Sequence, residues 1–147
     1  MKFTRLPLLI CFVATVAIIA ACGKYGPPQP QDPKRNFSFA ATQANVSGNC
    51  LNFITQVEGA HQNIDRIRLE LSPVNFDEDC PTCPFSADEV VYFMPSETKM
   101  DASNGELTFS YCPKPAKGYR WRILGVSRFS TVPHAATFAQ YTEMVSE

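Results

Sequence analysis

The sequence contains few of the residues that most enzymes use for catalysis. Only two of its 147 residues are histidines, His61 and His134, and neither lies near a Gly-x-Ser-x-Gly or similar nucleophile motif. It has no glycine-rich loop of the kind that cradles phosphate, and no pair of carboxylates stands at an informative position. Both histidines fall in expected loops and are interpreted as ordinary surface residues. The sequence therefore predicts a protein that is not an enzyme.

A strong excess of charge of either sign is also absent. The formal net charge is −1 at pH 7, from 13 lysines and arginines against 14 aspartates and glutamates. Domains that bind nucleic acid usually carry a clear excess of basic residues. Nucleic acid is therefore not expected as a partner.

One long apolar run is present, at the amino terminus, and it has the organisation of a secretory signal. Lys2 and Arg5 provide positive charge before and at the edge of the run Leu6–Ile18. This run is too short for a comfortable membrane span of about 20 residues. Two alanines and a cysteine follow in the segment Ile19–Cys22, and proline-rich sequence comes next. We therefore expect the chain to leave the cytoplasm.

The segment Ile19–Cys22, Ile-Ala-Ala-Cys, resembles the bacterial lipobox. The resemblance implies that residues 1–21 are removed and that Cys22 receives a diacylglyceryl group and an N-acyl chain such as palmitate, with no other cofactor. Gly23, where an aspartate would favour the inner membrane, implies a lipid anchor in the outer membrane, facing the periplasm. Two alternatives stay open: a plain secretory signal with Cys22 in a disulfide, and an apolar anchor that is never cut.

Residues 22–35 are expected to form a tether between the lipid and a domain. Gly26–Pro33 contains four prolines, which remove backbone donors and fix φ, so an extended, semi-rigid segment is predicted. The opening Cys22–Pro27, Cys-Gly-Lys-Tyr-Gly-Pro, also resembles the start of short lipoproteins linked to lipopolysaccharide-transport assembly. That resemblance implies an accessory role in such an assembly.

Residues 36–147 show the short alternating runs and turn signals of an all-β domain. The alternation is clearest in Ile64–Leu71, where Ile67, Leu69 and Leu71 share one face. No segment combines sufficient length with a helical period of 3.6 residues. The expected strands lie within 37–41, 50–57, 64–71, 90–94, 107–111, 119–126 and 135–145, with a long irregular segment at 72–88. About seven strands predict a two-sheet β-sandwich.

Gly118–Ser127, Gly-Tyr-Arg-Trp-Arg-Ile-Leu-Gly-Val-Ser, resembles the sixth strand of a fibronectin type III domain, an immunoglobulin-like sandwich. The resemblance implies that Tyr119 is a tyrosine corner, with its hydroxyl bonded to backbone upstream, and that Trp121 and Ile123 point into the core. It departs from the family in the second strand, where Phe53 or Thr55 stands near the usual tryptophan. It implies a fold and little about function.

Four cysteines remain once Cys11 is removed with the signal and Cys22 carries lipid, and two disulfides are the preferred interpretation. Cys50 and Cys112 fall at strand ends and can pair with each other, which leaves Cys80 and Cys83 as a tight loop. Alternatively, Cys80 and Cys83 pair separately with Cys50 and Cys112. Other interpretations are a metal site, in which Cys80 and Cys83 are joined by the other two cysteines or by the histidines, and a thiol-redox couple. The preferred interpretation includes no metal.

Two sets of charged residues are further candidate sites. If the strands 64–71 and 119–126 are neighbours, Arg66 and Arg68 face outward beside Arg120 and Arg122, with Arg128 nearby. Such a face can bind an anionic envelope component or an acidic protein, or it can be a solvated face with Glu70 as a cross-strand partner. The acidic residues 77–79 and 88–89 could bind calcium, although an exposed acidic loop is preferred.

The leading hypothesis is a non-enzymatic lipoprotein of the cell envelope that acts as a structural or protein-interaction module. A metal-binding or thiol-redox protein that uses Cys80 and Cys83 is the alternative, followed by the accessory role in lipopolysaccharide transport.

Overall fold

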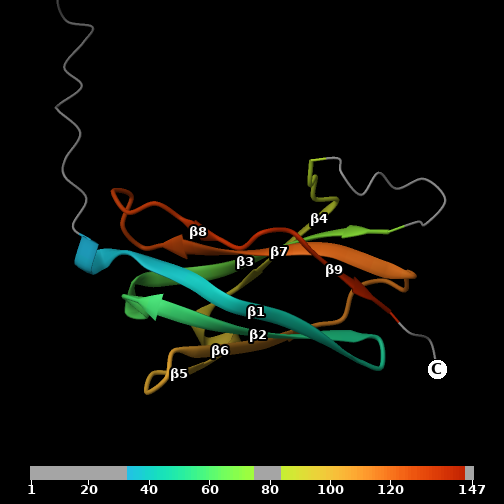
Figure 1. The fold of residues 1–147 in the computed structure, drawn as a ribbon, viewed down its shortest axis with the longest axis horizontal. Coiled ribbons are helices and arrows are strands. Elements are labelled where there is room, and N and C mark those ends of the chain that lie inside the picture. Colours follow the sequence, from blue (N-terminus) through green and yellow to red (C-terminus); the bar gives the residue numbers. More distant parts are fainter. Residues whose placement is uncertain (1–32, 75–83, 145–147) are drawn as a thin grey trace, which may run out of the picture. The chain divides into compact units, whose positions relative to one another are not determined.

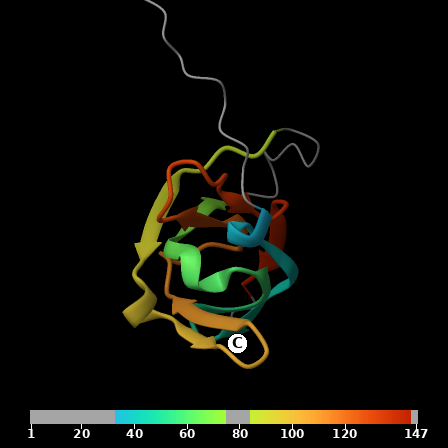
Figure 2. The ribbon, with the colours of Figure 1, turned by 90° about the vertical axis from the view of Figure 1, so that its left-hand side faces the viewer.

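Two antiparallel sheets face each other in the computed structural model, which describes residues 33–74 and 84–144 (Figure 1). The strand order is β1-β2-β6-β5 in the first sheet and β4-β3-β7-β8 in the second, where β9 also pairs with β7. Seen from its end, the domain shows the two sheets as separate layers (Figure 2). This arrangement confirms the predicted all-β, two-sheet sandwich.

The first sheet consists of β1 (Phe37–Ser47), β2 (Cys50–Gly59), β5 (Lys99–Asp101) and β6 (Glu106–Tyr111). The second sheet consists of β3 (Ile64–Pro73), β4 (Glu89–Phe93), β7 (Gly118–Ser127), β8 (Ala135–Ala136) and β9 (Gln140–Glu143). Three short 3-10 turns accompany them: η1 (Pro33–Arg35), η2 (His61–Asn63) and η3 (Pro95–Glu97). Among residues 33–74 and 84–144, no helix is long and apolar enough to span a membrane.

Three elements differ from the sequence-based expectation. The first strand continues to Ser47, because Gly48 adopts a φ of 59° and turns the chain directly into β2. The strand β5 was not predicted, since three residues are too few to show alternation. The single strand expected within 135–145 is two short strands, β8 and β9, both paired with β7.

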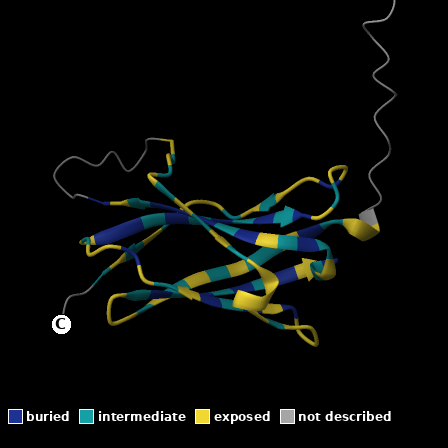
Figure 3. Cartoon of the chain, turned by 180° about the vertical axis from the view of Figure 1, so that it is seen from behind, coloured by how far each residue is buried: buried dark blue, intermediate teal, exposed yellow. Residues whose placement is uncertain are grey.

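The core is formed by the inward faces of both sheets, which Figure 3 shows as buried positions alternating with exposed ones. Trp121 is fully buried on β7, and its ring meets Phe53 of β2 edge-to-face at 5.0 Å between centroids. Phe53 also stacks on Phe109 of β6 at 4.9 Å. The indole N–H of Trp121 donates to Oγ1 of Thr142 at 2.9 Å, so its polar group is satisfied. Phe53 thus occupies the centre of the sandwich opposite the tryptophan.

Tyr119 takes the position that the resemblance implied. Its ring is buried, and its hydroxyl donates to the backbone carbonyl of Lys114, five residues upstream. Burial raises the pKa of this hydroxyl above its ordinary value. The bond fixes the entry of the chain into β7, and Trp121 and Ile123 follow as fully buried side chains.

Gly125 allows the first sheet to approach β7 closely. A Cβ atom at this position would lie 2.5 Å from the ring of Phe37 and 3.0 Å from the ring of Phe39, both on β1. Carbon atoms cannot approach to 2.5 Å, so the two phenylalanine rings occupy the space that any side chain would need. The missing side chain therefore sets how β1 packs across the core.

Candidate partner-binding face

The four arginines singled out from the sequence lie on the outer face of the second sheet. β3 and β7 are antiparallel neighbours, with Arg66 opposite Val126 and Arg68 opposite Leu124. Further along, Glu70 pairs with Arg122 and Ser72 with Arg120. Directly opposed residues of neighbouring strands point to the same side of a sheet. The topology therefore brings the arginines from two distant segments onto one surface, as the sequence pattern required.

Glu70 lies among these arginines and is almost completely buried, with 2% of its surface exposed. Its Oε1 forms an ion pair with Nη2 of Arg68, and its Oε2 accepts a hydrogen bond from Nε of Arg122 at 2.5 Å. The two arginine side chains remain 37% exposed. One acid thus orders two guanidinium groups and leaves part of each facing solvent.

Aromatic rings lie beside three of the four guanidinium groups. Arg66 lies over the ring of Tyr92 on β4, with 5.5 Å from its Cζ to the ring centre. Arg120 and Arg122 lie over the ring of Phe85, at 5.8 Å and 5.1 Å. A cation over an aromatic face is attracted by the ring quadrupole and is held in place. Phe85 comes from the segment before β4, which is folded back across the sheet.

β4 adds apolar surface beside the arginines. It lies at one edge of the second sheet, where β3 is its one partner among the described strands. Val90 and Tyr92 lie opposite Glu70 and Arg68, so they share the outer face, and both are exposed, Tyr92 by 51%. Met94, directly after the strand, is also half exposed. We call the outer surface of β4, β3 and β7, together with Phe85, the arginine–aromatic face.

Acidic side chains on and next to β3 and β4 are engaged locally. Asp88 accepts a hydrogen bond from the hydroxyl of Ser72 at 2.5 Å, and Glu89 accepts one from the hydroxyl of Tyr111. Asp65 forms an ion pair with Arg66 at 3.5 Å. Asp88 and Glu89 thus accept hydrogen bonds from protein hydroxyls, and the acidic residues 77–79 lie outside the described residues.

The cysteines are only partly described. Cys50, at the start of β2, forms a disulfide with Cys112, which directly follows β6. This pairing agrees with the first of the two connectivities considered from the sequence. Cys22, Cys80 and Cys83 lie outside the described residues, so the structure does not address the lipid site or the Cys-x-x-Cys segment.

The two histidines have separate surroundings in the part of the chain that the structure describes. Nδ1 of His134 accepts a hydrogen bond from the backbone N–H of Ser127 at 3.3 Å, while His61 belongs to η2. Among residues 33–74 and 84–144, no three histidines, cysteines or acids gather as they would around a metal ion.

Sequence reasoning placed the arginines correctly but missed how they are ordered. The sequence indicated Glu70 as a cross-strand partner of the arginines, and its ion pair with Arg122 agrees with this, but its almost complete burial was not predicted. Phe85 was part of an irregular segment, with no pattern to place it over Arg120 and Arg122. The presence of one acid among four arginines was the sequence signal that pointed to this ordering.

No protein-family model matches the sequence, and no match to it was found among curated proteins.

Proposed function

We propose that the chain is a non-enzymatic lipoprotein of the bacterial cell envelope that binds an acidic segment of another envelope protein through its arginine–aromatic face. Cys22 carries the lipid, residues 22–35 form the tether, and the sandwich is the binding module on the periplasmic side of the outer membrane. The lipobox-like segment Ile19–Cys22 supports the anchor. The arrangement of arginines next to aromatic rings is the observation that carries the binding function.

The chemistry of this face favours an anionic group. A guanidinium that lies flat on a ring keeps its N–H edge free to donate two parallel hydrogen bonds to a carboxylate. The guanidinium carbon of Arg66 lies 5.5 Å from the centre of the Tyr92 ring. Its Nε pairs with Asp65 at 3.5 Å, and the side chain is still 48% exposed, so its remaining N–H groups can meet a ligand. Because Glu70 and the rings already hold the arginines, little side-chain entropy is lost when a ligand binds.

The edge strand favours a protein as the source of that anion. Val90, Tyr92 and Met94 place apolar side chains next to the arginines, which suits a chain that offers both acidic and apolar residues. The free edge of β4 also offers backbone groups to an added strand. An extended acidic segment meets both requirements.

Site-specific photo-crosslinking in living cells tests this proposal. A photoreactive phenylalanine in place of Tyr92 is expected to capture the partner, because half of this side chain is exposed within the face. The matched control carries the same group in place of Ser38, an exposed position on the outer side of the first sheet. The product from position 92 is expected to be absent from position 38.

Charge reversal then tests the role of the arginines. Arg66→Glu in the chain that carries the crosslinker at position 92 is expected to weaken the captured complex by about 1 kcal/mol, roughly fivefold, because a cation is replaced by a like charge facing the acidic partner. Lys99→Glu on β5, in the other sheet, is the control. Equal crosslinking from positions 92 and 38, or equal yields for both charge variants, would contradict the proposal. A lipid as the only captured product would also contradict it.

A further inference from the structure

A separate cavity opens at one end of the sandwich, between the start of β3 and the segment from η3 to β6. It has a volume of about 180 Å³. Buried or half-buried apolar side chains form much of its wall: Ile64 and Ile67 of β3, Met100 of β5 and Leu107 of β6. Pro95 and Thr98 of the η3 region close another side. For comparison, an apolar cavity of roughly 150 Å³ can hold a benzene molecule.

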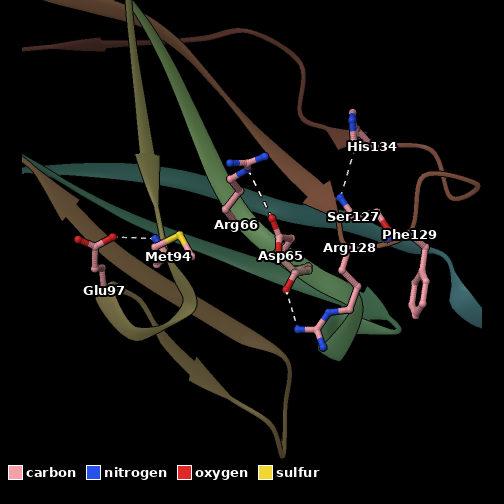
Figure 4. Close-up of polar contacts among 9 residues, drawn as sticks. Asp65, Arg66, Met94, Glu97, Ser127, Arg128, Phe129 and His134 are labelled. Carbon is pink, nitrogen blue, oxygen red and sulfur yellow. Dashed lines mark hydrogen bonds and ion pairs between the residues drawn. The ribbon is translucent and has the colours of Figure 1, made fainter.

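Two arginines belong to the lining of this cavity, and no acidic residue does. Arg128 is exposed directly after β7, and its Nη2 donates to the carbonyl oxygen of Ile64 at 3.4 Å. Arg66 lies on the neighbouring strand, where Asp65 pairs with it at 3.5 Å. Figure 4 shows Arg66 and Arg128 on different sides of the start of β3, with Asp65 turned toward Arg66.

Glu97, which lies in the chain between the lining residues Pro95 and Thr98, is engaged within its own turn. The carboxylate of Glu97 accepts a hydrogen bond from the backbone N–H of Met94 at 2.7 Å, which closes the η3 turn (Figure 4). Asp65 partly neutralises Arg66, whereas Arg128 contacts a backbone carbonyl, so Arg128 is the better placed of the two lining arginines to meet the carboxylate of a ligand in the cavity. Its contact with the Ile64 carbonyl, at 3.4 Å, is long for a hydrogen bond and is easily exchanged for a stronger one.

We propose that this cavity binds a small amphiphilic carboxylate, with an apolar group of about benzene size against Leu107 and Ile67 and the carboxylate at Arg128. The apolar wall gains from removal of hydrocarbon from water, and the guanidinium matches the two oxygens of a carboxylate. This cavity is distinct from the arginine–aromatic face, because Arg66 is the only one of the four arginines of that face that also lines the cavity.

The test uses the full chain extracted from cells and held in nanodiscs of zwitterionic phosphatidylcholine, with empty nanodiscs as the blank. Benzoate is the probe, and benzyl alcohol is its uncharged equivalent of the same size. Binding is followed by NMR of the isoleucine, leucine and methionine methyl groups at pH 7. Benzoate is expected to shift the methyl signals of Ile64, Ile67, Met100 and Leu107, with a dissociation constant on the order of 1 mM for a ligand of this size.

Variants separate the apolar and charged parts of the site. Arg128→Gln is expected to weaken benzoate binding about fivefold and to leave benzyl alcohol unaffected, because only the carboxylate meets this side chain. Lys99→Gln removes an exposed charge from β5 and is expected to change neither ligand. Met100→Trp fills the cavity and is expected to abolish binding of both, with unchanged signals from the distant core residue Leu51 showing that the variant folds.

Three results would overturn the proposal: no benzoate-induced shift at these methyl groups, benzyl alcohol binding as tightly as benzoate, or equal effects of Arg128→Gln and Lys99→Gln. The comparison of the two ligands on the unaltered chain decides the matter even if Met100→Trp fails to fold. Loss of the envelope partner with benzoate binding intact would separate this site from the arginine–aromatic face.

Discussion

Only 2% of the surface of Glu70 is exposed to solvent. Each of its carboxylate oxygens faces a guanidinium group, that of Arg68 at Oε1 and that of Arg122 at Oε2. Removing a carboxylate from water is costly unless charged partners replace the water. Both arginines stay partly exposed, so they can be hydrated again if the acid is lost. The burial of Glu70 thus requires the two arginines, whereas the arginines can remain charged and hydrated without Glu70.

We therefore expect Glu70→Gln to lower the free energy of unfolding by about 1–2 kcal/mol, because an amide turns an N–H donor toward a guanidinium. Urea unfolding at pH 7 measures the change. Glu58→Gln, at an exposed position of β2, is the matched control and should have little effect. A Glu70→Gln variant as stable as the parent would mean that the cost of burying the acid cancels the gain from its ion pairs.

A second single residue, Tyr111, makes the stability of the fold depend on pH. Its hydroxyl donates to Oε1 of Glu89 at 2.5 Å, and this bond, together with burial, raises the pKa of Tyr111 to about 12. The protonated hydroxyl is therefore favoured in the folded state. Its contribution to stability is complete below the ordinary tyrosine pKa of about 10 and is lost as the pH rises through about 12.

Ultraviolet titration of the tyrosines should show late ionisation of Tyr111 and also of the buried Tyr119, and Tyr111→Phe should reduce the number of late-ionising phenols by one. Glu89→Gln should shift the titration of Tyr111 to lower pH, because the charged acceptor is lost. Unfolding experiments between pH 10 and 12 should show a smaller loss of stability in Tyr111→Phe than in the parent. An unchanged number of late-ionising phenols in Tyr111→Phe would contradict this assignment.

At the scale of elements, the disulfide joins two strands that are already neighbours. Leu51 pairs with Tyr111 in the β2–β6 register, and the cysteines that flank this pair, Cys50 and Cys112, are bonded. The bond closes a segment with a sequence separation of 62 residues. Such a link reduces the freedom of the unfolded chain even where the folded strands need no further support.

The double substitution Cys50→Ala with Cys112→Ala should lower the free energy of unfolding by about 2–4 kcal/mol. Unfolding in guanidinium chloride measures this, with the parent chain under the same non-reducing conditions as the reference. Peptide mapping of the oxidised chain checks the connectivity. A peptide that links Cys50 to Cys80 or Cys83 would contradict the observed pairing.

The elements that could be predicted are those whose alternation is long enough to show. Ile64–Leu71 and Tyr119–Val126 alternate over a full strand, so their positions and inward faces were correct. Lys99–Asp101 is too short to alternate and was missed. The cysteine pairing was left between two connectivities, because it depends on strand register and spacing along the chain does not contain that information.

For the candidate site, the sequence predicted which arginines share a face but not how their side chains are held there. Outward arginines follow from alternation once β3 and β7 are neighbours. The burial of Glu70 and the stacking on Phe85 depend on how side chains fold over the sheet surface, which is a tertiary effect. The cavity behind η3 likewise depends on how two sheets separate at their ends, and no local pattern signals it.

At the scale of the whole molecule, the proposed anchor makes a prediction about mass. The chain extracted from membranes should begin at Cys22 and carry a diacylglyceryl group and an N-acyl chain. Intact mass spectrometry measures this, and Cys22→Ser is the control that should give a chain without lipid. A parent mass that starts at Cys22 without added lipid would indicate a plain secretory signal, and a mass that includes residues 1–21 would indicate an uncut anchor.

The close contact between Gly125 and β1 limits how related sequences can vary. Since the rings of Phe37 and Phe39 occupy the space where a Cβ would stand at position 125, these three positions cannot vary independently. Sequences that share ancestry with this chain should keep glycine there, or replace it only together with a smaller residue at position 37 or 39. That joint variation offers a way to recognise distant relatives whose overall similarity has been lost.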